Sequence, residues 1–323
     1  MKKWIACVLV LGLYFQAACM AFAEEKYSLK IRYPEGTYTM IQEMEMDMAT
    51  KMKVGEMGSM RFPSVMKQTY EMRIIAGPVV EDGSQKVEME FVRVAADVST
   101  SGIRMRYDSG GDAKKNARSP LKVLDFMVGV KFSVTYDKDG KAAKVEGVDA
   151  LWDKMLAKSN AATKEMMESL REKMLSEEAL AKMINVGMES YSEKTVAVSE
   201  SWDSETEMEV PMIGKIRVKA THTLESVEKR DGTEIATIRS RINMEAEDLD
   251  ETILEEVKMQ FEGYNILADS TLVLDVKTGL PISGGAKMTQ RVVMKADNAG
   301  EMSMNMEIDG TSETRTTVTR EEQ

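Results

Sequence analysis

The chain has 323 residues and a formal net charge of −11, from 54 acidic and 43 basic side chains, with a single histidine. It contains no basic tract and no interleaving of basic with aromatic residues, so we do not expect nucleic acid, which is bound by neutralising its phosphates, as a partner. Both cysteines, Cys7 and Cys19, lie in the first 19 residues. The remainder of the chain therefore has no thiol nucleophile, thiolate metal site or disulfide.

The first residues have the order of a secretory signal. A positive end at Lys2 and Lys3 precedes an apolar run over residues 4–15, and residues 21–23, Ala-Phe-Ala, place small side chains at both positions of a cleavage site. We expect residues 1–23 to be a signal peptide and the mature chain to be periplasmic or extracellular. Loss of the two lysines makes the charge of the mature chain −11 − 2 = −13.

Attachment to a membrane is the next question. Ala17-Ala18-Cys19 has the small residues of a lipoprotein processing site, so lipid anchoring at Cys19 is the alternative to cleavage after Ala23. No later segment approaches the ~18 unbroken apolar residues of a membrane-spanning helix. We therefore expect no transmembrane segment in the mature chain.

Residues 24–147 read as a first run of β-strands, because apolar and polar residues alternate with period two. The sharpest alternation sets Met44, Met46 and Met48 on one face against acidic residues on the other. Residues 55–63 are expected to be a loop. A short helix is expected after Ser119-Pro120. The segment 137–140, Asp-Lys-Asp-Gly, is expected to be a hairpin turn, since the further ligands of a calcium loop are missing.

Residues 148–191 differ, because their apolar residues recur every three and four positions, as on one face of a helix. Three amphipathic helices are expected. Their apolar faces are formed by Val148, Leu151, Trp152, Met155 and Leu156; by Met166, Met167, Leu170 and Met174; and by Leu180, Met183, Ile184 and Met188. Ser176 is expected to cap the third helix. These helices are expected to form a layer or a lid on the open face of a sheet.

Residues 193–323 return to the β pattern. His222 falls on the apolar side of its strand, where a lone histidine is expected to be a hydrogen-bonded packing residue, with a ligand or catalytic role as the alternative. Acidic residues crowd between residues 245 and 256. We expect a solvated loop there, with a divalent cation site as the alternative. Met302, Met304 and Met306 repeat the earlier methionine row.

Together these elements predict a mainly β protein of the α+β class. It is expected to hold antiparallel curved sheets, or a half-barrel, with a three-helix segment in the middle of the chain. Residues 24–323 are expected to form a β-rich domain with a helical insertion at 148–191, either as one unit or as two β halves, 24–147 and 193–323.

Methionine is unusually frequent. Without Met1 and Met20 the chain keeps 27 of its 29 methionines, against 15 leucines. In an exported protein, rows of thioethers could bind Cu(I), which is a soft ion. Methionine also fills cores as a flexible apolar residue, and it lies on the predicted apolar faces of all three helices, so core filling is the preferred interpretation.

Several short motifs resemble those of a family of exported bacterial proteins, domain of unknown function 6263. They are Tyr33-Pro34-Glu35-Gly36-Thr37-Tyr38; Phe132-x-Val134-x-Tyr136-Asp137 with Gly140 and Val145-x-Gly147; Val196-Ala197-Val198-Ser199-Glu200-Ser201-Trp202; and Leu274-Asp275-x-x-Thr278-Gly279. The resemblance covers nearly the whole mature chain. Ser199 stands where a turn of the Val-x-x-Gly-Asp-x-Trp type has glycine. The family implies a β-rich exported protein and supplies no catalytic residues.

No nucleophile elbow, phosphate loop or dinucleotide motif is present, so no catalytic residue, metal or cofactor is assigned. We expect a non-enzymatic envelope protein that binds an apolar, lipid-like ligand or a protein partner. A carboxylate-based hydrolase and a methionine-rich Cu(I)-binding protein are the alternatives. The candidate ligand-binding residues form the apolar rows Met44, Met46, Met48, Met302, Met304 and Met306.

Overall fold

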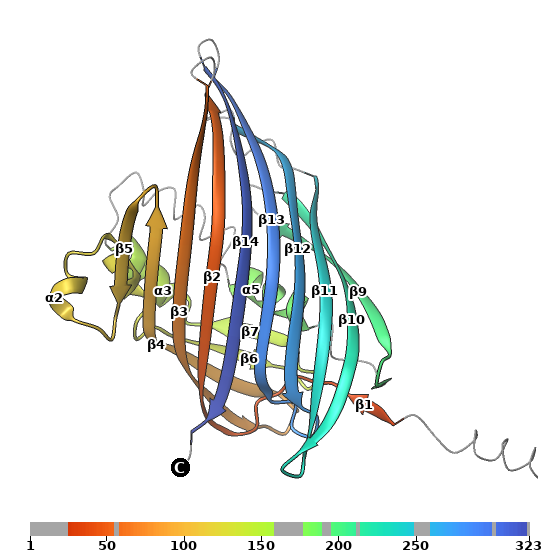
Figure 1. Cartoon of the computed structure of the whole chain (residues 1–323). Coiled ribbons are helices and arrows are strands. Elements are labelled where there is room, and N and C mark those ends of the chain that lie inside the picture. The colour runs from red at the N-terminus through yellow and green to blue at the C-terminus, as the bar shows by residue number, and fades with distance from the viewer. Residues whose placement is uncertain are drawn as a thin grey trace, which may run out of the picture.

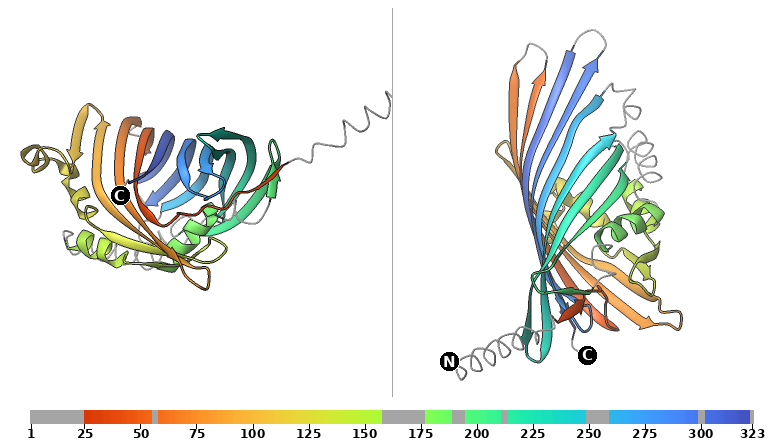
Figure 2. Two further views of the ribbon diagram at one scale, coloured as in Figure 1. Left: turned by 90° about the horizontal axis from the view of Figure 1, so that it is seen from below. Right: turned by 90° about the vertical axis from the view of Figure 1, so that its right-hand side faces the viewer.

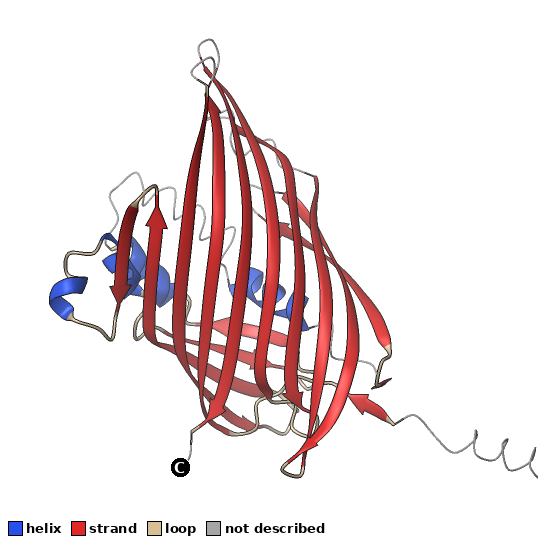
Figure 3. Cartoon of the chain, viewed as in Figure 1, coloured by secondary structure: helices blue, strands red, loops and turns tan. Residues whose placement is uncertain are grey.

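The computed structural model describes residues 25–54, 58–157, 177–188, 195–210, 214–248, 259–298 and 302–321. Figure 3 shows that strands dominate them. The strands are β1 (Lys26–Ser28), β2 (Gly36–Val54), β3 (Ser59–Val79), β4 (Gln85–Thr100), β5 (Ile103–Asp108), β6 (Lys131–Tyr136), β7 (Ala142–Glu146), β8 (Thr195–Ala197), β9 (Ser201–Val210), β10 (Gly214–Arg230), β11 (Thr233–Asp248), β12 (Met259–Asp275), β13 (Pro281–Asn298) and β14 (Met302–Arg320). The helices are α2 (Ala113–Asn116), the 3-10 helix η1 (Pro120–Phe126), α3 (Asp149–Leu156) and α5 (Glu177–Met188).

Twelve of the described strands form one antiparallel sheet. Its order is β7-β6-β4-β3-β2-β14-β13-β12-β11-β10-β9, with β5 paired to β4 beside that path (Figure 1). β2 lies near the start of the chain and β14 near its end, and these two strands pair with each other in the middle of the sheet. Strands from before and after the helical segment therefore share one sheet. The sheet is open and strongly curved, with α3 and α5 on its hollow side (Figure 2). The expectation of a mainly β protein with an antiparallel curved sheet is confirmed.

The two faces of this sheet differ as the alternation predicts. The outer face carries charged side chains in opposed pairs, such as Lys67 with Glu45 at 2.8 Å and Arg291 with Glu307 at 2.6 Å. These pairs are solvent-exposed and contribute little to stability individually. The inner face carries apolar side chains. The curvature therefore wraps an apolar surface inside a charged one.

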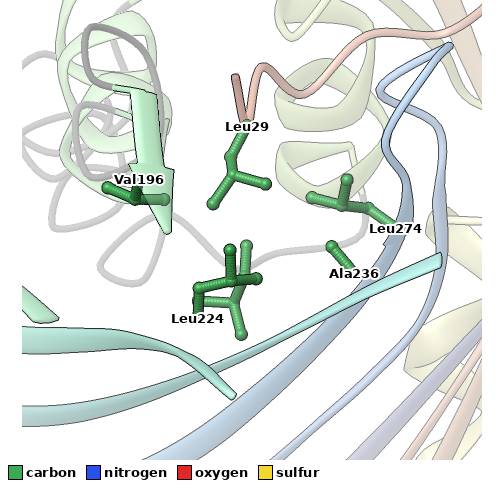
Figure 4. Close-up of a cluster of buried hydrophobic side chains, with 6 residues drawn as sticks. Leu29, Val196, Leu224, Ala236 and Leu274 are labelled. Atoms are coloured by element: carbon green, nitrogen blue, oxygen red, sulfur yellow. The ribbon is translucent and has the colours of Figure 1, made fainter. Parts of the chain in front are cut away.

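One end of the hollow side is filled by the chain itself. The segment 26–34 crosses it, and β1 pairs with β8 there. Leu29 packs among the fully buried side chains of Leu224, Ile238 and Leu274 (Figure 4). The Arg32 amide donates to the Gly279 carbonyl at 2.8 Å, which ties the segment to the β12–β13 turn. We call residues 26–34 the strap and this part of the molecule the closed end.

The position of the strap accounts for the glycine at position 279. Gly279 has a φ of +75°, and a Cβ at this position would lie 2.1 Å from the Lys30 carbonyl oxygen. Two requirements, a left-handed backbone and a close approach of the strap, are therefore met by one residue without a side chain.

The helical segment differs from the prediction. Where three helices were expected in residues 148–191, the described residues contain two, α3 and α5, and the expected helix around residues 166–174 falls outside the described residues. Trp152 of α3 is buried with Val134, Ala142 and Val145, so these helices pack on β6 and β7 at one edge of the sheet. Amphipathic periodicity predicted helices with one buried face, but it does not state which strands they cover.

The prediction of a loop at residues 55–63 is also wrong in part, because β3 begins at Ser59 and includes Pro63. Met60 and Phe62 continue the alternation and pair with Met52 and Thr50 of β2. The pairing of β3 with β4 ends at Ser64, so Pro63 lies where β3 has a partner on one side only, and a proline is tolerated there.

Two predicted local structures are confirmed. The Asp137 carboxylate accepts from the amides of Asp139 and Lys141 at 2.9 Å each, as expected of the hairpin turn. Ser119 caps η1 by accepting from the Leu121 amide at 3.2 Å. Ser199, which occupies the glycine position of the turn before β9, has a φ of 70°, so the conformation that favours glycine is present with serine in place.

Candidate functional site

A cavity of about 1350 Å³ lies against the sheet. It crosses eight neighbouring strands, and each strand contributes one inward-facing residue together with its outward-facing neighbours in sequence, most of which are polar or charged. In sheet order from β3 to β9 the inward-facing residues are Gln68, Met44, Ser312, Met288, Ala268, Ile242, Ala220 and Ser204.

The register of the sheet brings these residues together. From β14 to β9 they are directly opposed in successive pairs: Ser312 with Met288, Met288 with Ala268, Ala268 with Ile242, Ile242 with Ala220, and Ala220 with Ser204. Residues that are directly opposed in an antiparallel pair point to the same face. A band of the wall is thus assembled from strands that are far apart in the sequence.

Several inward residues at this level of the sheet are small. Ala268, Ala220 and Ser312 project little from the backbone, and Gly310 lies at the next inward position of β14, where an added Cβ would be 2.9 Å from the Gln290 side chain. Met44, Met288, Ile242 and Leu267 are the larger apolar residues of the lining.

A chain of hydrogen bonds around the buried histidine adjoins the cavity through Ser204, which lines it. His222 is 2% exposed, with Nε2 at 2.9 Å from Ser204 Oγ and Nδ1 at 2.7 Å from Ser240 Oγ. The Trp202 ring lies 5.3 Å away. Burial lowers the pKa of His222 below its ordinary value, so the ring is neutral near pH 7. The histidine is a hydrogen-bonded packing residue, as its position on the apolar side predicted.

The two predicted methionine rows occupy different levels of the inner face. Met44 lines the cavity, and Met46 and Met48 continue along β2, opposite Ser312 and Gly310 of β14. Met306 is opposed to Met52 instead. Met302 and Met304 lie further along β14, and their side chains are outside the described residues. Because the strands are antiparallel, the rows extend each other and do not face each other.

Sequence reasoning placed Ala220 and Ile242 on an inward face and missed that they line a cavity with Ala268, Ser312 and Met288. Alternation assigns a residue to a face but does not give the register between strands. Runs of small residues on an otherwise apolar face were the available signal.

The acidic stretch at 245–256 is described only up to residue 248. Among the described residues, no three histidine, cysteine or acidic side chains gather closely enough to hold a metal ion. Within that same part of the chain, no helix has both the length and the hydropathy needed to cross a membrane.

Comparison with solved structures finds weak likenesses. Lipovitellin, in a structure described by its lipid–protein interactions, has a TM-score of 0.42 at 7% identity; the match covers 90% of this chain and 26% of the lipovitellin chain. The outer membrane protein OprG from Pseudomonas aeruginosa has a TM-score of 0.23 at 5% identity, covering 90% of this chain and 98% of that one. This chain spans about a quarter of the lipovitellin length, and at these scores the likenesses carry no argument about the ligand.

Comparison with curated protein sequences gives no match. A family model does match, over residues 82–281, which is 281 − 82 + 1 = 200 of the 323 residues and includes the motifs from Phe132 to Gly279. The chain belongs to the family of unknown function DUF6263.

Proposed function

We propose that the protein is a non-enzymatic binding protein of the cell envelope, which holds an apolar, chain-like molecule such as a lipid on the hollow side of its sheet. The observation that carries the proposal is an open, curved sheet whose inner face keeps half-buried methionines, together with a cavity of about 1350 Å³ whose accessible lining is more apolar than polar. Ligand sites are typically concave and mostly apolar, with a few placed polar groups.

The length of the wall suits a long molecule. Inward methionines run along β2 from Met40 to Met52, which is twelve residues or about 40 Å of strand. Between them, Met44, Met46 and Met48 are half-buried. Methionine side chains are flexible and polarisable, so they adapt to chains of different length and curvature. These features favour a class of apolar ligands over one rigid molecule.

The carboxylates near the cavity support binding over hydrolysis. Glu45, Asp269 and Glu313 line the cavity, and each has a cation within 4 Å. A glycosidase-type acid needs a carboxyl group with a raised pKa beside the substrate, whereas the hydrogen bond from Arg315 lowers the pKa of Glu313. The burial of a neutral, doubly hydrogen-bonded His222 likewise suits a packing residue.

Export is part of the proposal. The signal-like residues 1–23 would direct the chain through the inner membrane, and an acidic, charged outer face suits an aqueous envelope compartment. The proposed carrier therefore shields an apolar molecule in water between membranes or outside the cell.

Two residues of the sheet provide the test. Ala268 of β12 lines the cavity, whereas Ile75 of β3 is 42% exposed and does not line it. Binding of a fluorescent fatty acid is measured by titration for the parent protein, Ala268→Trp and Ile75→Trp. We expect micromolar binding that is lost with Ala268→Trp, because the indole fills the cavity, and kept with Ile75→Trp. Equal binding by all three proteins, or none by the parent, would contradict the proposal.

A further inference from the structure

Four methionines form a row across four neighbouring strands, beyond the cavity and toward the ends of β2 and β14 that lie away from the strap. Met60 of β3 is directly opposed to Met52 of β2, Met52 to Met306 of β14, and Met306 to Met294 of β13. Directly opposed side chains share a face. We call these residues the methionine quartet.

Exposure separates the quartet from core methionines. Met60 is 46% exposed, and Met52, Met294 and Met306 are half-buried, whereas Met72 in the lower part of the same sheet is 8% exposed. Core filling accounts for Met72 because its side chain is surrounded by protein. It does not account for four thioethers at a partly open level of the sheet.

The spacing suits one shared ion. Opposed Cβ atoms in antiparallel strands lie roughly 4.5–5.5 Å apart. An ion with metal–sulfur bonds on the order of 2.3 Å, bound by three sulfurs in a plane, needs those sulfurs about 4 Å apart. In three consecutive members of the row, the outer two lie on strands about 9.5 Å apart. Methionine has three rotatable side-chain bonds, so the two outer side chains can lean toward the central one and bring the three sulfurs to the spacing of about 4 Å without moving the backbone.

The donor type selects the ion. Thioether sulfur is a soft and uncharged ligand, which favours Cu(I) and related soft ions over magnesium, calcium or zinc. A monovalent ion is also easier to hold than a divalent one where the ligands supply no negative charge.

We propose that the methionine quartet is a binding site for a soft monovalent cation of the Cu(I) class. Three of its four thioethers coordinate the ion, and the fourth is available for exchange at the exposed side. The site is separate from the cavity around Ala268 and does not depend on what that cavity holds.

Silver(I) is the probe, because it is soft and monovalent and needs no reductant. Titration calorimetry compares the parent with Met52→Leu/Met306→Leu, which removes the two central thioethers at nearly constant volume. The control is Met40→Leu/Met72→Leu, since Met40 and Met72 are also directly opposed on β2 and β3 but lie in the packed part of the sheet. Urea midpoints for all three proteins show whether the fold is kept.

We expect one silver ion per chain at micromolar or tighter affinity, weakened at least about tenfold by the quartet variant and unchanged by the control. Bound silver should also protect Met52, Met60, Met294 and Met306 from peroxide oxidation, as read by peptide mass mapping. No binding by the parent, or equal weakening by both double variants, would overturn the site. Fatty-acid binding to the same variants is a separate readout and tests the cavity alone.

Discussion

The closed end and the cavity belong to one sheet with one alternation, yet their inward residues differ in kind. At the closed end the inward residues are branched aliphatics, and Leu224, Ile238 and Leu274 are fully buried against the strap. At the level of the cavity they are mostly methionine, alanine and serine, with Gln68 and one branched aliphatic, Ile242, as the exceptions, and Met44 and Met288 are only half-buried. Branched side chains with few rotamers suit a fixed partner supplied by the chain itself. Flexible and small side chains suit a ligand that binds reversibly.

The largest difference between the two regions should appear on truncation. Leu274→Ala removes a fully buried side chain, and we expect the free energy of unfolding to fall by about 2–5 kcal/mol. Met288→Ala removes a half-buried side chain beside existing space, and we expect a loss of about 1 kcal/mol. Urea unfolding with an unchanged slope measures both. Equal losses would show that the cavity level is packed as tightly as the closed end, contrary to the comparison.

The strap can be tested through Gly279. Gly279→Ala combines an unfavourable positive φ with a Cβ that would lie 2.1 Å from the Lys30 carbonyl oxygen, so we expect a loss of roughly 2–4 kcal/mol. Gly232→Ala is the matched control, because Gly232 has a φ of +83° and no atom within 4 Å of an added Cβ. It should cost only about 1 kcal/mol. A similar loss in both variants would mean that the strap does not press on the turn.

His222, between the two regions, gives the pH dependence. The pKa of His222 is lowered in the folded protein from the value of 6.5 expected in the unfolded chain. The unfolded chain therefore binds more protons as pH falls below 6.5, and the stability from neutral His222 is lost as pH falls from there through the folded pKa. It is the only histidine of the chain. Urea midpoints between pH 8 and 5 should therefore fall more steeply for the parent than for His222→Gln, and parallel curves would refute the assignment.

The smallest effect is expected at the turn before β9. Ser199 has a φ of 70°, a conformation that glycine adopts without strain. Ser199→Gly should raise the free energy of unfolding by about 0.5–1 kcal/mol, net of the added freedom of the unfolded chain. Thermal unfolding would show a small rise in Tm, and a fall would mean that the serine side chain contributes a contact larger than the strain.

The amino-acid pattern predicts the face on which a residue lies, but it does not predict which residues of other strands lie beside it. The alternation of Met44, Met46 and Met48 with acidic residues fixed which face of β2 is apolar, and this face is the inner one. It could not show that Ala268, Ile242 and Ala220 lie side by side, because register arises from pairing along whole strands. Nor could it show that Met306 is directly opposed to Met52 and not to Met44. The strap was also missed, since β1 is only three residues long and its partner β8 is distant in sequence.

The central claim is that the cavity level of the inner face holds an apolar chain. Its most direct test is NMR of the protein with isotope-labelled methionine methyl groups, in the presence of a fatty acid that carries a nitroxide spin label. Binding at the proposed place predicts strong broadening of the Met44 and Met288 methyl signals and little change at Met89, which packs with the buried clusters of β4 and β6. Broadening at Met89 without broadening at Met44 and Met288, or no broadening at any of the three, would contradict the account.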